Sequence, residues 1–390
     1  MCSLLLASNF LRITSANILT ISRNMSMWSV GIKSLIGICT GLFCAGETLF
    51  FFYRILVNFD VDFMMQFAPF SFNNCYAAII IVQTICKYSS FKNLTNYIDK
   101  HFWSLDNAET EAQNEISIDM KIFKYLMVTS VGVVIITATV YMPGNGIYDD
   151  QTMFVLIEWL HHGYFPEYVK YIVMIVNFLK LFPQAYFMLT YLFQLCFFIN
   201  SYRYQTILIK WKLINITKDL SKLNTKSEMY YNEAYQTAIK RRLINCIKQH
   251  IILSQYAEKV INYFYYTLLW QIMSGIIVFV SLIYIFMFHN SYNKQSAVIT
   301  NIVGVYFASF FYTLYGQLFQ DQNDILLEAT MKSNWENFNK SNKKTLLIFM
   351  INLKRSYILV GLGIIPVNFD MFIWFCNKVV ALLGVIEAME

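Results

Sequence analysis

Hydrophobic residues along this 390-residue chain fall into long blocks that shorter polar segments separate. A helix needs about 20 mostly apolar residues to cross the roughly 30 Å of hydrocarbon in a bilayer. Six blocks meet this requirement, at about 29–53, 63–86, 122–142, 171–199, 260–288 and 298–319. Each of these blocks is predicted to be a transmembrane helix.

The last apolar region, from Thr345 to Ile386, is too long for a single span. Two basic residues, two glycines and Pro366 interrupt it, and proline breaks a helix because it lacks the backbone N–H. The sequence therefore predicts a shorter helix at about 344–360 and a seventh membrane helix at about 367–386, with a break near Pro366. The predicted fold class is an all-α membrane protein with seven transmembrane helices.

The composition agrees with a lipid environment. The chain has 57% hydrophobic and 14% charged residues, whereas soluble proteins have about 45–50% and about 25%. No polar linker divides it into soluble domains. We expect a cytoplasmic amino-terminal segment at 1–28, six membrane helices with their inner loops at 29–319, a cytoplasmic segment at 320–360 and the last membrane helix at 361–390.

Basic residues are distributed unevenly between the predicted loops, and loops rich in Lys and Arg stay in the cytoplasm. With the amino terminus inside, the inner segments carry 24 Lys and Arg residues, whereas the outer loops carry only Arg54, Lys170 and Lys294. This bias predicts a carboxyl end outside the cell, opposite to a G-protein-coupled receptor. The net charge of +6 is then the inner excess that faces anionic lipid head groups, and no nucleic-acid partner is expected.

The sequence contains no pattern that indicates catalysis. The nearest candidate is Glu158 with His161 and His162, which share one face of a helix but lack a third metal ligand. We interpret them as part of a solvated polar loop. The cysteines show no Cys-x-x-Cys spacing, and none lies in a predicted outer loop. We therefore expect no enzyme, no cofactor and no metal site.

Glu47, Lys180 and Lys378 are charged side chains within the predicted spans, where charge is costly and often functional. Glu47 and Lys180 lie near the predicted ends of their helices, and we interpret them as side chains that extend to the membrane interface. Lys378 lies in the middle of the last helix, eight residues after Asp370. A pore-lining role and a structural ion pair both remain open for Lys378.

A distinctive pattern runs from the end of the sixth span into the last helix. In chain order it comprises Tyr315-Gly316, Ala329, Ser333-Asn334-Trp335, Lys343-Lys344, Leu346-Leu347, Met350, Arg355, Gly361 or Gly363, Pro366 and Phe369, with His250 before the fifth span. This pattern resembles the carboxyl-terminal signature of insect odorant receptors, whose length, span count and orientation the chain also fits. It departs from that signature at Ser356, where proline is common, and at Ile364-Ile365, where two phenylalanines are common.

The resemblance implies a ligand-gated, non-selective cation channel in the plasma membrane of olfactory sensory neurons, which binds a small volatile ligand. Four subunits would surround one pore, and the segment 320–360 would form a cytoplasmic anchor domain. The chain lacks the enlarged inner loop of the odorant co-receptor (Orco) and would therefore be the tuning subunit of a heterotetramer with it. For the segment 320–350, a solvated loop is the alternative to packed amphipathic helices.

The resemblance also implies where the pore lies. Aligning the last helix with the family places Val385 at a hydrophobic constriction, which blocks ions by dewetting. The predicted gate residues are Ala381, Leu382, Val385 and Met389. Glu387 and Glu390 would lie at the outer mouth and attract cations. Lipid contact is the alternative interpretation of the gate residues.

The ligand is expected in a closed, mostly apolar pocket within the outer half of the bundle, where aromatic surface and shape provide the affinity. The candidate residues are Phe70, Phe72, Tyr76, Thr137, Tyr141, Phe178, Phe182, Tyr186, Tyr306, Phe307 and Phe310. Core packing is the alternative role for each. Tyrosine hydroxyls are the expected polar contacts.

Three other classes of membrane protein were weighed. A gustatory-receptor-like channel is the nearest alternative, although the last helix reads KVVALLGVIEAME in place of the Thr-Tyr…Gln-Phe motif of that branch. A G-protein-coupled chemoreceptor would have the opposite orientation and usually an Asp/Glu-Arg-Tyr triplet. A secondary transporter would usually show an internal repeat.

Overall fold

The computed structural model of the chain describes residues 32–105, 108–141, 154–218, 220, 226–288, 292–361 and 363–389. The membrane-length helices are α3 (Ile32–Val57), α4 (Val61–Cys86), α6 (Thr110–Val140), α8 (Glu167–Ile214), α10 (Glu233–Phe288), α11 (Tyr292–Gln320) and α14 (Phe369–Met389). The shorter helices are α5 (Tyr88–His101), α7 (Val155–His162), α9 (Lys226–Tyr231), α12 (Gln322–Met331), η1 (Trp335–Asn337) and α13 (Lys340–Leu353). A two-stranded hairpin of β1 (Val360–Gly361) and β2 (Ile365–Pro366) precedes α14.

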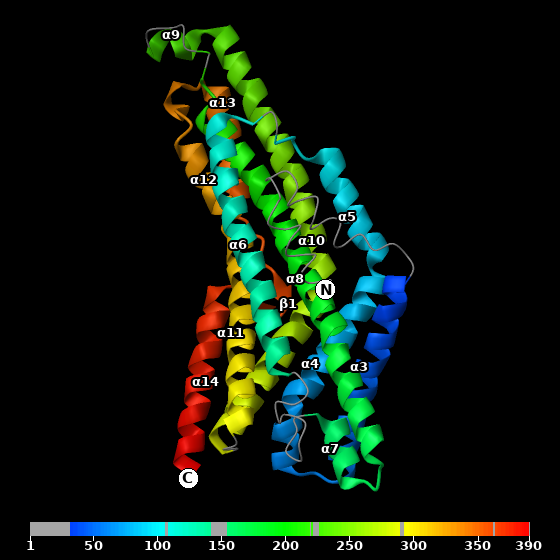
Figure 1. Cartoon of the computed structure of the whole chain (residues 1–390). Coiled ribbons are helices and arrows are strands. Elements are labelled where there is room, and N and C mark those ends of the chain that lie inside the picture. The colour runs from blue at the N-terminus through cyan, green and yellow to red at the C-terminus, as the bar shows by residue number, and fades with distance from the viewer. Residues whose placement is uncertain are drawn as a thin grey trace.

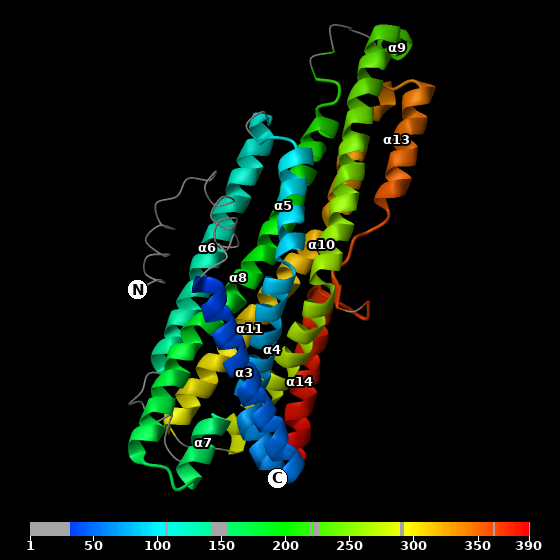
Figure 2. The same cartoon turned by 90° about the vertical axis from the view of Figure 1, so that its right-hand side faces the viewer.

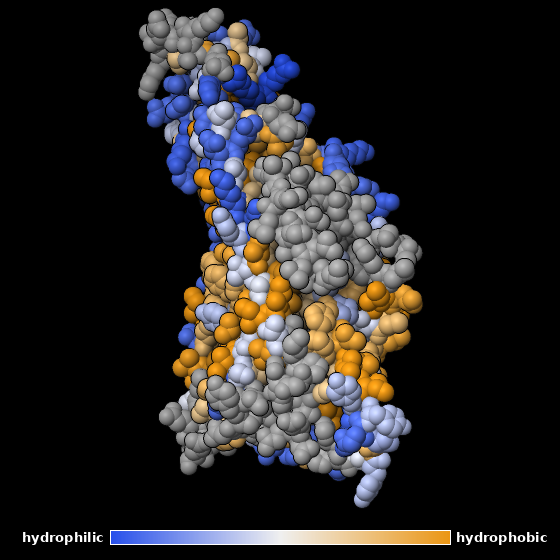
Figure 3. Space-filling model, in the orientation of Figure 1, coloured by the Kyte–Doolittle hydropathy of each residue, from blue (hydrophilic) through white to orange (hydrophobic). Residues whose placement is uncertain are grey.

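The bundle has an apolar half and a polar half. Figure 3 shows hydrophobic side chains over the half that contains α11, α14 and α3, and hydrophilic side chains over the end that carries α9, α12 and α13. The 56 residues of α10 rise roughly 84 Å at 1.5 Å per residue, much more than the roughly 30 Å of hydrocarbon. Because α8 and α10 outrun the membrane, they join the two halves (Figures 1 and 2).

The all-α membrane fold predicted from the sequence is confirmed. Six helices of the described chain are long and apolar enough to span a bilayer, and the 21-residue α14 completes the predicted set. The apolar blocks marked only the lipid-facing parts of longer helices. For example, the fifth block began near Val260, whereas α10 begins at Glu233. The expected helix at 344–360 was too long, because α13 ends at Leu353 and an extended segment follows.

The polar half is a packed layer in which α12 and α13 cover the ends of α8 and α10 (Figure 2). Phe338 is fully buried there beside Ala329 and Leu346. The Gln236 side chain joins the parts, since its Nε2 donates to the Asn337 carbonyl at 2.8 Å and its Oε1 accepts from the Asn342 amide at 2.9 Å. Segment 320–353 is therefore a packed helical element and not a solvated loop.

The hairpin before α14 approaches α11 at one glycine. A Cβ on Gly316 would lie 1.8 Å from the Val367 carbonyl oxygen, so no larger residue fits without moving backbone. Gly363 has φ +72°, a left-handed conformation that favours glycine. The Val367 N–H donates to the Leu359 carbonyl at 2.8 Å and closes the hairpin. These contacts set the position from which α14 starts.

Candidate ligand cavity and pore helix

A cavity of about 700 Å³ lies between α4, α6, α8, α10 and α11. Its walls are mainly Val, Ile, Leu, Met and aromatic side chains. Each of α4 and α8 carries an internal proline beside the cavity, Pro69 and Pro183, and proline leaves the carbonyl four residues earlier without its helical partner. Gly132 and Gly275 also line the cavity and have open space around them. A cavity of this size and character suits a small apolar molecule.

The structure brings six of the eleven candidate ligand residues together around this cavity. They are Phe70, Tyr76, Thr137, Tyr141, Phe182 and Tyr186. The Tyr76 and Tyr312 hydroxyls are 3.3 Å apart and share a hydrogen bond at the cavity wall. The predicted contact between a tyrosine hydroxyl and a ligand stays a prediction.

The other five candidates lie outside the cavity lining. Phe72 packs against Phe51 and Phe52 of α3. Phe178 packs edge-on to Phe182, and Phe307 packs against Phe311. Tyr306 and Phe310 contact Phe372 of α14, with ring centroids 5.3 and 5.9 Å apart. The last two residues therefore hold the last helix against α11.

The segment between α6 and α8 contributes a residue that sequence reasoning missed. Phe154, just before α7, is buried, and its ring centroid lies 4.5 Å from that of Phe70 and 6.1 Å from that of Tyr141. Both partners line the cavity. Phe154 therefore packs against two rings of the cavity wall. A loop aromatic gives no periodic signal, so the sequence could not have indicated this contact.

The interpretation of Glu47 and Lys180 as interfacial side chains was wrong. Their side chains are buried and form an ion pair between α3 and α8. The Asn74 amide on α4 donates to Glu47 Oε2 at 2.7 Å. Asn74 Oδ1 accepts from Lys180 Nζ at 3.4 Å and from Gln184 Nε2 at 3.1 Å. The pairing satisfies two charges within the apolar half, which is why neither side chain turns toward water.

Gln184 is the member of this network that lines the cavity. Other polar side chains in the wall, all missed by the sequence reasoning, are Asn73, Gln271, Ser274, Asn301, Ser309 and Tyr312. Single polar residues in an apolar block are too common to mark a site. The only signal in the sequence was Gln184 one helical turn after Lys180 in the same span. It indicated the hydrogen-bonded network of Glu47, Asn74 and Lys180 behind the cavity wall.

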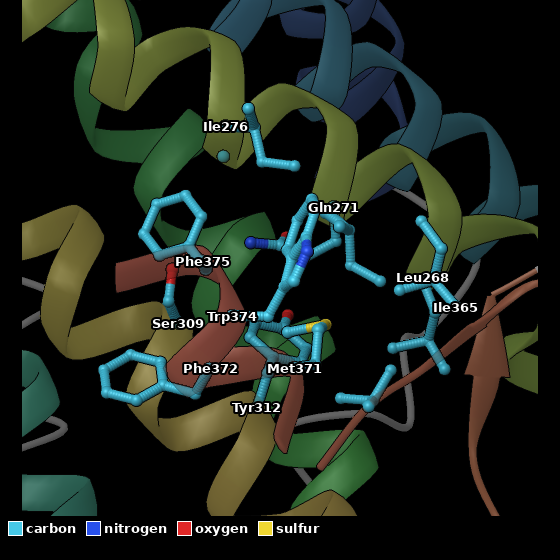
Figure 4. A pocket seen from close by; sticks show the side chains of 13 residues that line it. Leu268, Gln271, Ile276, Ser309, Tyr312, Ile365, Met371, Phe372, Trp374 and Phe375 are labelled. Carbon is cyan, nitrogen blue, oxygen red and sulfur yellow. The ribbon is translucent and has the colours of Figure 1, made fainter. Parts of the chain in front are cut away.

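A second, small cavity of about 40 Å³ lies between α10, α11 and α14 (Figure 4). The side chains of Met371, Phe372 and Phe375 enter it from α14, and Gln271 enters it from α10. Four residues line both cavities: Gln271, Gly275, Ser309 and Tyr312. A thin shared wall thus separates the large cavity from the last helix.

Helix α14 lies at the edge of the bundle beside α11 (Figure 1). Its inner face is held by Phe375, whose ring centroid is 5.3 Å from that of Phe279 on α10. The exposed side chains of α14 are Asp370, Asn377, Lys378 and Ala381 together with the apolar Ile373, Trp374 and Val380, and Trp374 also borders the small cavity. Lys378 forms no ion pair among the described residues; its Nζ lies 6.0 Å from the Trp374 ring. The side chains of Leu382, Val385, Glu387 and Met389, and Glu390 as a whole, lie outside the described residues.

Where α4 ends, a lysine lies at the boundary between the two halves. Lys87 Nζ donates to the Tyr263 carbonyl at 3.2 Å and lies 5.5 Å from the Tyr266 ring centroid. Burial lowers the pKa of Lys87.

Within the described chain no group of three His, Cys, Asp or Glu side chains is arranged to hold a metal. Glu158 lies 4.0 Å from Arg54, and the side chains of His161 and His162 are outside the described residues.

The fold and cavity define a class: a seven-helix membrane protein with a largely apolar cavity beside a last helix at the edge of the bundle. Residues 60–377 match the family model described as 7tm Odorant receptor, and the chain belongs to this family. No curated protein matches the sequence.

Solved structures share the fold. The insect olfactory receptor OR5 from Machilis hrabei superposes with a TM-score of 0.71 at 11% identity, over 92% of this chain and 88% of that one. The structure of the same receptor in complex with eugenol gives a TM-score of 0.75 at 10% identity, over 96% of this chain and 98% of that one. The fold is thus that of an insect olfactory receptor, whereas the cavity side chains must be interpreted from this chain alone.

Proposed function

We propose that this chain is an odorant-binding subunit of a heteromeric, ligand-gated, non-selective cation channel in the plasma membrane of olfactory sensory neurons. The observation that carries the proposal is the 700 Å³ cavity, which shares four wall residues with the small cavity against α14. The partner is the odorant co-receptor (Orco) in a heterotetramer. The chain has no enzymatic role in this proposal.

The cavity supports binding of a small volatile molecule. Five helices line it, and rings such as Phe70, Tyr186 and Phe182 offer apolar area without charge. The olfactory receptor that shares this fold has been solved with eugenol, a molecule of suitable size. We propose that this chain binds its ligand in the corresponding bundle.

The shared wall supports coupling between binding and gating. A ligand that contacts Gln271 or Tyr312 touches side chains whose other face borders α14. Such a ligand shifts the channel toward the open state by the difference between its affinities for the two states. Because Tyr306 and Phe310 also pack on α14, any shift of α11 moves the last helix with it.

The outer face of α14 supports a pore. Asp370 and Asn377 are exposed on one side of α14, where polar side chains are costly against lipid and suit a water-filled path between subunits. In this arrangement Val385 and its neighbours Ala381, Leu382 and Met389 form the gate, and Glu387 and Glu390 lie at the outer mouth. The polar half then lies in the cytoplasm, where exposed Leu347, Ile348 and Ile351 of α13 meet neighbouring subunits.

The test is voltage-clamp recording from cells that express the chain with and without the co-receptor, during exposure to a volatile panel that includes eugenol. We expect inward cation current that needs both subunits. Gly132→Leu places a side chain into open cavity space and should lower sensitivity to the active volatile at least about 10-fold, which is the effect of about 1.4 kcal/mol.

The matched control is Gly46→Leu, since Gly46 also has open space around it but does not line the cavity. It should respond like wild type. Equal responses of wild type and Gly132→Leu would place the ligand elsewhere. A ligand response through G-protein signalling without current would overturn the channel proposal.

A further inference from the structure

Some polar groups in the cavity wall have a hydrogen-bond partner within the protein, and others do not. The Thr137 hydroxyl donates to the Val133 carbonyl at 2.9 Å, and the Ser274 hydroxyl donates to the Gln271 carbonyl at 3.2 Å. The Gln184 side chain is 3% exposed, and its Oε1 has no hydrogen-bond partner. Buried polar atoms are nearly always paired in folded proteins. An unpaired buried acceptor at the wall of a ligand cavity therefore points to a group that the ligand supplies.

The orientation of the Gln184 amide is fixed by charge. Glu47 can only accept and Lys180 can only donate, so Asn74 must turn its Nδ2 to Glu47 and its Oδ1 to Lys180. That Oδ1 can in turn only accept, so Gln184 must present its Nε2 to Asn74, at 3.1 Å. Its Oε1 is then directed away from Asn74. The oxygen and nitrogen of a side-chain amide are hard to tell apart by shape. Here the Glu47–Lys180 ion pair determines which atom of the Gln184 amide is the oxygen.

Gln184 borders the cavity, but its Oε1 is buried within the wall, so a ligand hydroxyl reaches this acceptor after a small shift of the surrounding side chains. Glu47 and Asn177 also carry an unpartnered oxygen, but neither lines the cavity, whereas Gln184 does. Donation by its Nε2 to Asn74 also makes the carbonyl of the same amide a better acceptor, because hydrogen bonds in a chain polarise one another. The rest of the wall is largely apolar, so a charged donor such as an ammonium would lose its hydration without a counter-charge.

We infer that the ligand of this cavity is an uncharged alcohol or phenol, whose hydroxyl donates to Gln184 Oε1 while its apolar body fills the aromatic part of the cavity. This inference rests on the proposed function as a ligand-binding receptor. The Glu47–Lys180 pair acts behind the wall as the element that positions the acceptor.

The test compares isomers that differ only in having a donor. The probes are 1-octanol with heptyl methyl ether, and 3-phenylpropan-1-ol with 2-phenylethyl methyl ether. Dissociation constants are measured by microscale thermophoresis on the full chain in lipid nanodiscs, so that channel opening is not needed. We expect each alcohol to bind about 10-fold more tightly than its ether, because one hydrogen bond to a buried acceptor contributes an effect of this order.

Removing the acceptor should remove this preference. In Gln184→Leu, an alcohol would lose its hydrogen bonds to water and gain none, so the ether should bind as tightly as the alcohol or more tightly. Gln184→Met keeps the length of the side chain and serves if the leucine variant does not fold. Gln194→Leu is the matched control, since Gln194 is a buried glutamine on the same helix that does not line the cavity. It should keep the 10-fold preference.

Gln271 is the rival residue, because its Oε1 also lacks a partner and it lines both cavities. If Gln271→Leu abolishes the preference and Gln184→Leu does not, the assignment to Gln184 is overturned. Equal binding of alcohols and ethers to wild type overturns the ligand class while leaving the receptor proposal intact. If no probe of either kind binds, the ligand class assigned here is overturned, and the current recordings with the volatile panel decide the receptor proposal on their own.

Discussion

Helix α8 passes through both halves of the molecule, and its two ends differ in packing. Toward its start, Tyr168, Ile172 and Leu179 are exposed on the outside of the bundle, while Leu181 and Gln184 border the cavity. Farther along, every side chain from Thr190 to Tyr202 is buried. In lipid, exposed apolar side chains carry no hydrophobic penalty, so the first part need not pack tightly. The second part leads into the polar half of the molecule, where apolar side chains are buried beneath polar ones.

The difference suggests a division of work along the bundle. The apolar half contains the cavity and the last helix at its edge, which is the arrangement that the proposed ligand-controlled gate requires. The polar half has a continuous core with residues such as Leu213, Phe338 and Leu353 at 0–1% exposure, and it holds the helix ends in place. We therefore expect substitutions in the polar half to affect folding, and substitutions around the cavity to affect ligand response.

The largest effect is expected where the two halves meet, at Gly316. In Gly316→Leu the new Cβ would overlap the Val367 carbonyl oxygen, and backbone atoms cannot move aside as a flexible side chain can. We expect almost no folded protein, measured as surface expression and as a monodisperse peak in size-exclusion chromatography. Gly46→Leu, which meets no atom within 4 Å, should express like wild type. Normal expression of Gly316→Leu would show that the hairpin is not seated as described.

Much of this arrangement could be predicted from the sequence. The apolar blocks identified the membrane helices, because lipid imposes a minimum length of apolar chain on each. They could not show that α8 and α10 continue far beyond the bilayer, since the extensions carry the mixed pattern of a helix packed in water. The motif around Gly316 and Ser333 indicated the family, and the structure gives the physical reason for the glycine.

The cavity was harder to predict because hydropathy does not fix the rotation of a helix within a bundle. On α11, Tyr306 and Phe310 face α14, whereas Ser309 and Tyr312 of the same helix line the cavity. Ion pairs between residues far apart in the sequence were equally hard to predict. Glu47 and Lys180 are 133 residues apart, and nothing within either span marks the other as its partner.

The second prediction concerns that pair. Lys180→Met would leave Glu47 buried without its counter-charge, which typically costs about 3–5 kcal/mol. We expect a clearly lower melting temperature in nanodiscs and reduced surface expression. The double variant Glu47→Leu/Lys180→Met removes both charges and should recover most of the loss, because the two effects are coupled.

The exposed pair Lys332–Glu328 in the polar half provides the control. Lys332→Met should leave the melting temperature unchanged, since exposed ion pairs contribute little. If Lys180→Met also melted like wild type, Glu47 would not depend on the pair for its place in the apolar half. The charge-based orientation of Asn74 and Gln184 would then lose its basis.

The last prediction compares two phenylalanines of the same size in the two halves. Phe338→Ala empties a fully buried position in the polar half, and a substitution of this kind costs about 3–5 kcal/mol. Phe182→Ala removes a ring that lines the cavity but is 48% exposed, and such partly exposed positions cost much less, roughly 1 kcal/mol or below. Melting temperature should therefore fall strongly in Phe338→Ala and little in Phe182→Ala. Ligand-evoked current per channel at the surface should show the reverse order, because only Phe182 lines the proposed ligand cavity. A Phe182→Ala variant with wild-type sensitivity to every active volatile would remove this residue from the site, and a stable Phe338→Ala variant would remove the distinction between a packed half and a hollow one.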